Sequence, residues 1–222
     1  MDIALFTSHG LDYLFRWGHF LTGITWIGLL YYFNFVQGEY FKEAEADHRA
    51  GAIQKLVPRA LWWFRWSAMF TFLTGVVLLA FRAQAISFDI TIGAILGTLM
   101  FLNVWVIIWP NQKIVIASAT QVAGGGEAIP EAAAAAPKAA LASRTNTLFS
   151  FPMLFFMGSS MHMSSGLIGS ASTVALGVIL LIIAALEVNG IVGKQGPMTS
   201  VNGVIGSGIG LTAVLYGLMV AL

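Results

Sequence analysis

The sequence of 222 residues contains no cysteine and very few charged residues. Without cysteine, the chain cannot form disulfides, zinc–thiolate sites, iron–sulfur clusters or the covalent attachment of a c-type haem. Charged residues make up 9% of the chain, against roughly 25% in an ordinary soluble domain. The formal net charge of +1 provides no basic face for nucleic acid. These absences exclude a soluble globular enzyme, a disordered chain and a nucleic-acid-binding protein.

Apolar residues are what the sequence has in abundance. They make up 58% of the chain and include 16 Phe and 7 Trp, a composition typical of a membrane bundle with aromatic belts. A helix needs about 20 apolar residues to cross the lipid hydrocarbon, and long uncharged runs meet this requirement. The sequence predicts a single all-α integral-membrane domain over residues 1–222. Its six spans are predicted near 12–36, 62–82, 90–110, 147–168, 173–190 and 201–221.

Lysine and arginine are distributed unevenly between the two sides of this predicted bundle. The opposite side has only Arg82, besides Arg16 within the first span. The loops after the first, third and fifth spans hold eight, which are Lys42, Arg49, Lys55, Arg59, Lys113, Lys138, Arg144 and Lys194. The positive-inside rule therefore places these loops in the cytoplasm and both termini in the periplasm of a bacterial inner membrane.

Two of the cytoplasmic segments have unusual compositions. Residues 114–146 include a glycine triplet and an alanine run, and we interpret them as a low-complexity connector with at most a frayed helical turn. The acidic–basic stretch from Glu39 to Lys55 is predicted as a charged loop, with an interfacial helix as the alternative.

Two histidines, His19 and His162, fall inside predicted spans, where an ionisable residue is a candidate for function. At ~1.5 Å per residue, both lie roughly 10–12 Å below the outer face, on helices that run in opposite directions. Axial imidazoles at one depth on two helices are able to hold a single non-covalent haem b. The alternative is that each histidine only hydrogen-bonds a neighbouring helix.

The neighbours of the two histidines favour the haem. Residues four apart share a helix face, and small residues there leave room for a flat porphyrin. The glycines in question are Gly23 beside His19, and Gly158 and Gly166 on either side of His162. Arg16 lies one turn nearer the outside than His19 and suits a haem propionate. His19 and His162 are thus the predicted metal ligands.

Glycines and amides in other spans have two interpretations each. Asn103 in the third span is able to bind a substrate or a neighbouring helix, and the structural role is favoured. In the last span the glycines form a smooth stripe, made of Gly203, Gly206, Gly208 and Gly210. Such a stripe indicates helix packing or self-association, and hence a possible homo-oligomer.

Four groups of residues, taken together in their order along the chain, resemble those of a known protein family. They are Arg16-Trp17-Gly18-His19 with Gly23 to Gly28; Trp63-Phe64-Arg65-Trp66 with Leu73-Thr74-Gly75; Gly97 to Met100 with Asn103 and Pro110-Asn111-Gln112; and Asn146, Pro152, Leu154-Phe155, Met157, Ser159 and His162. Over about residues 12 to 165 the chain resembles the N-terminal membrane domain of the bacterial membrane-bound urate hydroxylase (urate oxidase) family. The chain departs from the family's pattern at Ser67, where an acidic residue is usual, and around His162.

The resemblance implies a redox module that oxidises urate to 5-hydroxyisourate. Because urate is a planar anion, Arg65, Asn103 and Gln112 are candidate substrate contacts in the cytoplasmic half. In the family a c-type cytochrome domain commonly follows; this cysteine-free sequence has none, so the haem is expected to pass electrons to a separate periplasmic c-type cytochrome. The alternative is a non-catalytic haem-binding or structural subunit of a respiratory membrane complex. A transporter is a third hypothesis, for which the sequence shows no repeat.

Overall fold

The computed structural model describes residues 4–222, and this part of the chain folds into helices and loops without a β-strand. The predicted all-α class is therefore confirmed. The α-helices are α1 (Ser8–Tyr31), α2 (Gly38–Glu43), α3 (Ala46–Lys55), α4 (Val57–Phe81), α5 (Phe88–Leu102), α6 (Trp109–Ala123), α7 (Ala132–His162), α8 (Thr173–Val192) and α9 (Val201–Ala221). Two π-helices, η2 (Tyr32–Gln37) and η3 (Asn103–Ile108), and three short 3-10 helices, η1 (Ala4–Phe6), η4 (Ile168–Ser170) and η5 (Gly196–Thr199), complete the order.

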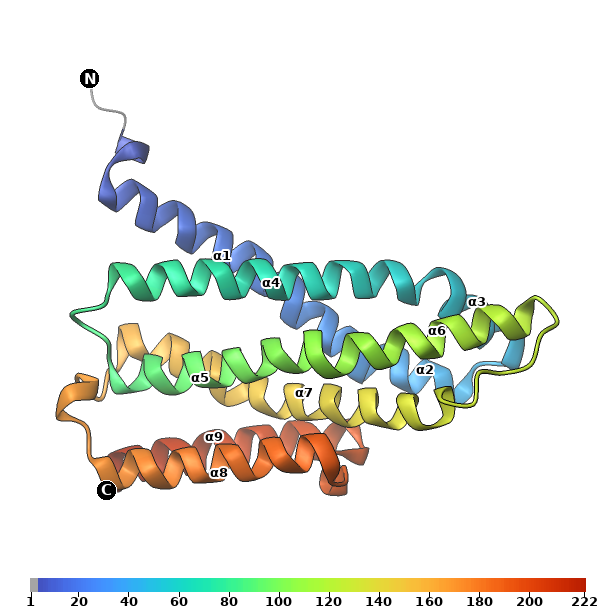
Figure 1. Ribbon diagram of the computed structural model, residues 1–222. Helices are drawn as coiled ribbons and strands as arrows, with labels where there is room; N and C mark the ends of the chain where they lie inside the picture. Colours follow the sequence, from blue (N-terminus) through green and yellow to red (C-terminus); the bar gives the residue numbers. More distant parts are fainter. Residues whose placement is uncertain (1–3) are drawn as a thin grey trace.

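The long helices lie side by side, and α1 crosses them obliquely (Figure 1). Helix α7 is central, because it packs against α1, α5, α6, α8 and α9. We call the end of the bundle that holds α2, α3, the α6–α7 loop and η5 the inner end, and the opposite end the outer end. The start of α1 and the C-terminus both lie at the outer end (Figure 1). Of the eight lysines and arginines assigned to cytoplasmic loops, seven lie on α2, α3, α4, α6 and α7, and Lys194 lies in the loop before η5.

Four helices in the described part are long and apolar enough to cross a membrane: α4, the continuous rod from α5 through η3 to α6, α8 and α9. All six predicted spans overlap helices: the span 12–36 covers most of α1 and continues into η2, and the span 147–168 follows α7 as far as His162. The exact count of six spans stays a prediction. The membrane character follows from the apolar length of the four helices, most of whose side chains face outward.

Two of the inner segments differ from their prediction. The connector expected over residues 114–146 is wrong in extent, because helix covers all of it except 124–131. Alanine is the strongest helix former, so a run of it that looks like low complexity extends α7 instead. The stretch from Glu39 to Lys55, predicted as a loop with a helix as the alternative, forms the short helices α2 and α3.

Pro110 does not end its helix, although a proline inside a helix removes one backbone hydrogen bond. The π-helix η3 lies directly before it, and the rod continues from Phe88 to Ala123. A π-turn widens the helix, which gives the proline ring room. This arrangement keeps α6 in line with α5 and so carries Gln112 to the inner end.

Helix α7 is packed closely by α8 and α9 through glycines. A Cβ atom at Gly190 of α8 would lie 2.7 Å from Oγ1 and 3.0 Å from Cβ of Thr145, which is completely buried in α7. Gly208 of α9 similarly faces the ring of Phe151. The glycine-rich sequences of these spans therefore serve helix packing at these two positions.

We expect Gly190→Ala to destabilise the protein by about 1–3 kcal/mol, because Thr145 has no room to move away from the added methyl group. Gly177→Ala is the matched control on the same helix, since no described atom lies within 4 Å of its Cβ position. Thermal unfolding of both variants in detergent checks this. Equal melting temperatures for the two variants would show that the contact is not tight.

Candidate functional site

His19 lies on α1 against α4. Its Nδ1 atom is 3.0 Å from Oγ1 of Thr74, and that hydroxyl donates its proton to the carbonyl of Phe70 at 2.6 Å. That hydroxyl is also 3.0 Å from the carbonyl of Thr71, and with its proton on either carbonyl it accepts from Nδ1–H in the tautomer that leaves the lone pair on Nε2. A metal-bound histidine usually has its other ring nitrogen held in this way. The chemistry of His19 thus fits an axial haem ligand.

His162 is the last residue of α7 and is exposed. The helix ends there because the following segment turns to Asp89, a completely buried carboxylate in the first turn of α5. Asp89 accepts from the hydroxyl of Ser159 at 2.6 Å and from the backbone N–H of Ser165 at 2.7 Å. Helix α7 is therefore six residues shorter at its outer end than the predicted span 147–168.

The glycines that were predicted to leave room for a porphyrin beside the two histidines are only partly in place. Gly166 was expected on the face of His162, but it lies beyond the end of α7 in a loop, with φ of +100°. Gly23 faces Thr71 of α4, whose Cγ2 would be 3.9 Å from an added Cβ. Gly158 borders open space, with no described atom within 4 Å.

The contacts of Arg16 and the packing of α1 and α7 also bear on the predicted haem site. The Nη2 atom of Arg16 pairs with the Asp12 carboxylate at 2.7 Å rather than being held ready for a propionate. Helices α1 and α7 meet farther inward, where Tyr31 bonds Ser150 at 2.9 Å. In Figure 1 the first half of α1 and the end of α7 lie on opposite sides of α4. The pairing of His19 with His162 on one iron stays a prediction.

The optical spectrum of purified protein tests that pairing. If both imidazoles bind one haem b, His19→Ala and His162→Ala each lose the bis-imidazole spectrum. His48→Ala is the control, because His48 lies exposed on α3. A spectrum that survives in His19→Ala would contradict the ligand assignment.

The three candidate substrate residues are separated by the structure. Arg65 stacks on Trp109, with the guanidinium carbon 3.8 Å from the ring centroid. Asn103 donates to Asn146 at 2.9 Å and to Glu187 at 3.1 Å, and this network joins three helices. Both side chains thus have partners within the protein. Gln112 alone of the three borders a cavity.

This cavity has a volume of about 290 Å³ and lies at the inner end, where η2, α2 and η5 meet the helices α4, α6 and α7. It is large enough for one small molecule, near the lower limit of typical ligand pockets. Its apolar wall comes mainly from Phe33, Phe64, Leu61, Val57 and Ile108. Its polar wall comes from Asn34, Gln37, Lys42, Gln112, Ser143, Arg144, Gln195 and Thr199. We call it the inner cavity.

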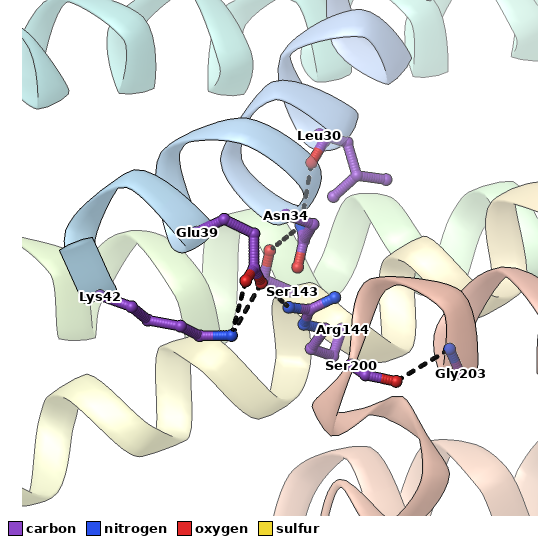
Figure 2. Close-up of polar contacts among 8 residues, drawn as sticks. All are labelled: Leu30, Asn34, Glu39, Lys42, Ser143, Arg144, Ser200 and Gly203. Carbon is purple, nitrogen blue, oxygen red and sulfur yellow. Dashed lines mark hydrogen bonds and ion pairs between the residues drawn. The ribbon is translucent and has the colours of Figure 1, made fainter.

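Arg144 is the most deeply covered cation of the polar wall. Its side chain is 9% exposed, and its nearest carboxylate oxygen, on Glu39, is 3.9 Å from Nη2 (Figure 2). Burial lowers the pKa of this guanidinium, and the charge of Glu39 opposes the shift; the group stays protonated at neutral pH. The carboxylate of Glu39 compensates this charge only from a distance, so Arg144 is a candidate for binding an anion.

Two buried atoms of this wall lack a hydrogen-bond partner within residues 4–222: Nη1 of Arg144 and Oε1 of Gln37. Buried polar groups are normally paired, so each such atom requires an explanation. One atom is a donor and the other an acceptor. An oxygen with negative charge suits the donor, and an N–H group suits the acceptor.

Sequence analysis missed both residues. Arg144 was counted among the loop cations, although it directly precedes the longest uncharged run of the chain, Thr145 to Leu186. That position was the available signal, because a cation beside such a run is drawn into the bundle. Gln37 ends the π-helix η2, which no sequence pattern indicated.

Comparison with known proteins identifies one relationship. The family described as "Urate oxidase N-terminal" matches residues 81–195, which is more than half of the chain. The matched part includes Gln112, Arg144 and His162, whereas His19 and Gln37 precede it. No curated protein and no solved structure matches the chain.

Proposed function

Because the chain belongs to the urate oxidase N-terminal family, we propose that it is a membrane module of urate oxidation that binds urate in the inner cavity. The observation that carries the proposal is the pair of buried atoms, Nη1 of Arg144 and Oε1 of Gln37, that find no partner in the described part of the chain. The residues that carry these two atoms, Arg144 and Gln37, line a cavity of suitable size in a protein related to urate enzymes.

The chemistry of urate suits these groups. At neutral pH urate is a planar monoanion with carbonyl oxygens and ring N–H groups on its edge. Arg144 is able to donate to an oxygen, and a charge-assisted hydrogen bond of this kind is about twice as strong as a neutral one. Gln37 is able to accept from a ring N–H. The aromatic rings of Phe33 and Phe64 supply the apolar surface for the flat faces.

The location of the cavity suits a cytoplasmic substrate. By the positive-inside rule the inner end faces the cytoplasm of a bacterial inner membrane. Oxidation of urate with water gives 5-hydroxyisourate, two protons and a pair of electrons, so an electron acceptor is required. When bound between His19 and His162, haem b would supply one-electron chemistry toward a separate periplasmic c-type cytochrome. The residues of the inner cavity bind and orient the substrate.

A non-catalytic role in a respiratory assembly is the second candidate. Gly206 and Gly210 of α9 have no described atom within 4 Å of their Cβ positions. This open face of small residues would accept a helix of another subunit. Urate binding at Arg144 distinguishes the two roles, because an accessory subunit requires none.

We expect Arg144→Gln to weaken urate binding roughly 10- to 100-fold, because it removes a charged hydrogen bond in a buried site. Lys138→Gln is the matched control, since Lys138 is an exposed cation on the same helix. Equilibrium dialysis of urate against protein in lipid nanodiscs measures both. Unchanged affinity in Arg144→Gln, with the fold intact, would overturn the proposed site.

A further inference from the structure

A second, shallow cavity that is largely open to solvent adjoins the inner cavity and is bordered by Phe35 and the start of α9. The two cavities share Lys42 and Thr199 in their walls. Arg144 lines the inner cavity, whereas Glu39 lines the second one. The ionic contacts of Glu39 with Lys42 and with Arg144 therefore connect the walls of the two cavities.

Glu39 has two unequal partners. Both of its carboxylate oxygens accept from Nζ of Lys42, at 2.8 and 2.9 Å. Its approach to Nη2 of Arg144, at 3.9 Å, is too long for a hydrogen bond (Figure 2). The carboxylate of Glu39 thus contacts Lys42 directly and does not reach hydrogen-bond distance of the Arg144 guanidinium. Arg144 keeps a nearby negative charge without being neutralised by direct contact.

The backbone around Glu39 explains how the residue is placed there. The π-helix η2 ends at Gln37, and the six-residue helix α2 follows directly from Gly38. A Cβ atom at Gly38 would lie 3.2 Å from the carbonyl oxygen of Phe33, which favours glycine at this point. The π-helix thus sets Gln37 toward the inner cavity and Glu39 at its border.

From this geometry we infer that Glu39 is a specificity-determining residue, an internal anion that competes with the substrate for Arg144. The inference rests on the proposed function for the identity of the ligand. An entering anion takes the place of Glu39 beside Arg144, and Glu39 is then held by Lys42 alone. Lys42 acts on the ligand only through Glu39. The carboxylate excludes weakly bound anions, because a ligand must bind Arg144 better than Glu39 does.

Two substitutions have opposite expected effects on urate affinity. Glu39→Gln removes the competing charge and raises the affinity about fivefold. Lys42→Gln releases Glu39 toward Arg144 and lowers the affinity by about threefold. In the double variant Glu39→Gln/Lys42→Gln the affinity equals that of Glu39→Gln, because Lys42 then has nothing to hold. Glu43→Gln is the control, since Glu43 is an exposed acid on the same short helix.

Equilibrium dialysis of urate with these variants and with Arg144→Gln separates the outcomes. If Arg144→Gln abolishes binding while Glu39→Gln binds as the unaltered protein does, the role of Glu39 is refuted and the proposed function stands. If Lys42→Gln lowers affinity equally in the Glu39→Gln background, Lys42 binds the ligand directly and the inference is also refuted. If Arg144→Gln changes nothing, the proposed function fails as well.

Discussion

The organising constraint of this protein is the burial of a guanidinium group in an apolar helical bundle. A charge removed from water requires compensation, and Arg144 receives only a distant carboxylate at 3.9 Å. Its Nη1 atom has no acceptor within the described residues. Such an arrangement costs stability and is retained where it serves binding. The proposed roles of the inner cavity and of Glu39 both depend on this one charge.

The scaffold that holds Arg144 in place depends on helix α7 and on the two π-helices. Close packing against Gly190 and Gly208 fixes α7 against α8 and α9, which lie together on one side of it (Figure 1). The π-helix η2 directs the end of α1 toward α7, where Asn34 donates to the Ser143 hydroxyl at 2.8 Å. The π-helix η3 lets the α5–α6 rod pass Pro110 without a break. Irregular helical turns thus position the cavity wall, as is frequent at functional sites.

Much of the fold could be predicted from the sequence, because uncharged runs of about 20 residues have few alternatives to a helix in lipid. The outer end of α7 is where the structure differs from the predicted span. Asp89 draws the chain after His162 into a loop, which takes Gly166 off the helix. That contact joins residues far apart in sequence, and a local pattern does not reveal it.

The candidate site was harder to predict than the fold. Gln112 was identified and does line the inner cavity, but Arg65 and Asn103 have partners elsewhere. Arg144 was counted as a loop cation because charge counting cannot tell which cations are covered by neighbouring helices. Ser67, where the family usually has an acidic residue, donates to the Phe64 carbonyl at 3.0 Å and provides no carboxylate. Side-chain burial, rather than residue type, decided these outcomes.

The most direct measurement is an experimental structure of the protein in nanodiscs with urate present. We expect urate to lie in the inner cavity. One of its oxygens is then within hydrogen-bond distance of Nη1 of Arg144, and a ring N–H is directed at Oε1 of Gln37. A cavity that contains only water, or urate bound at the outer end beside His162, would contradict this expectation.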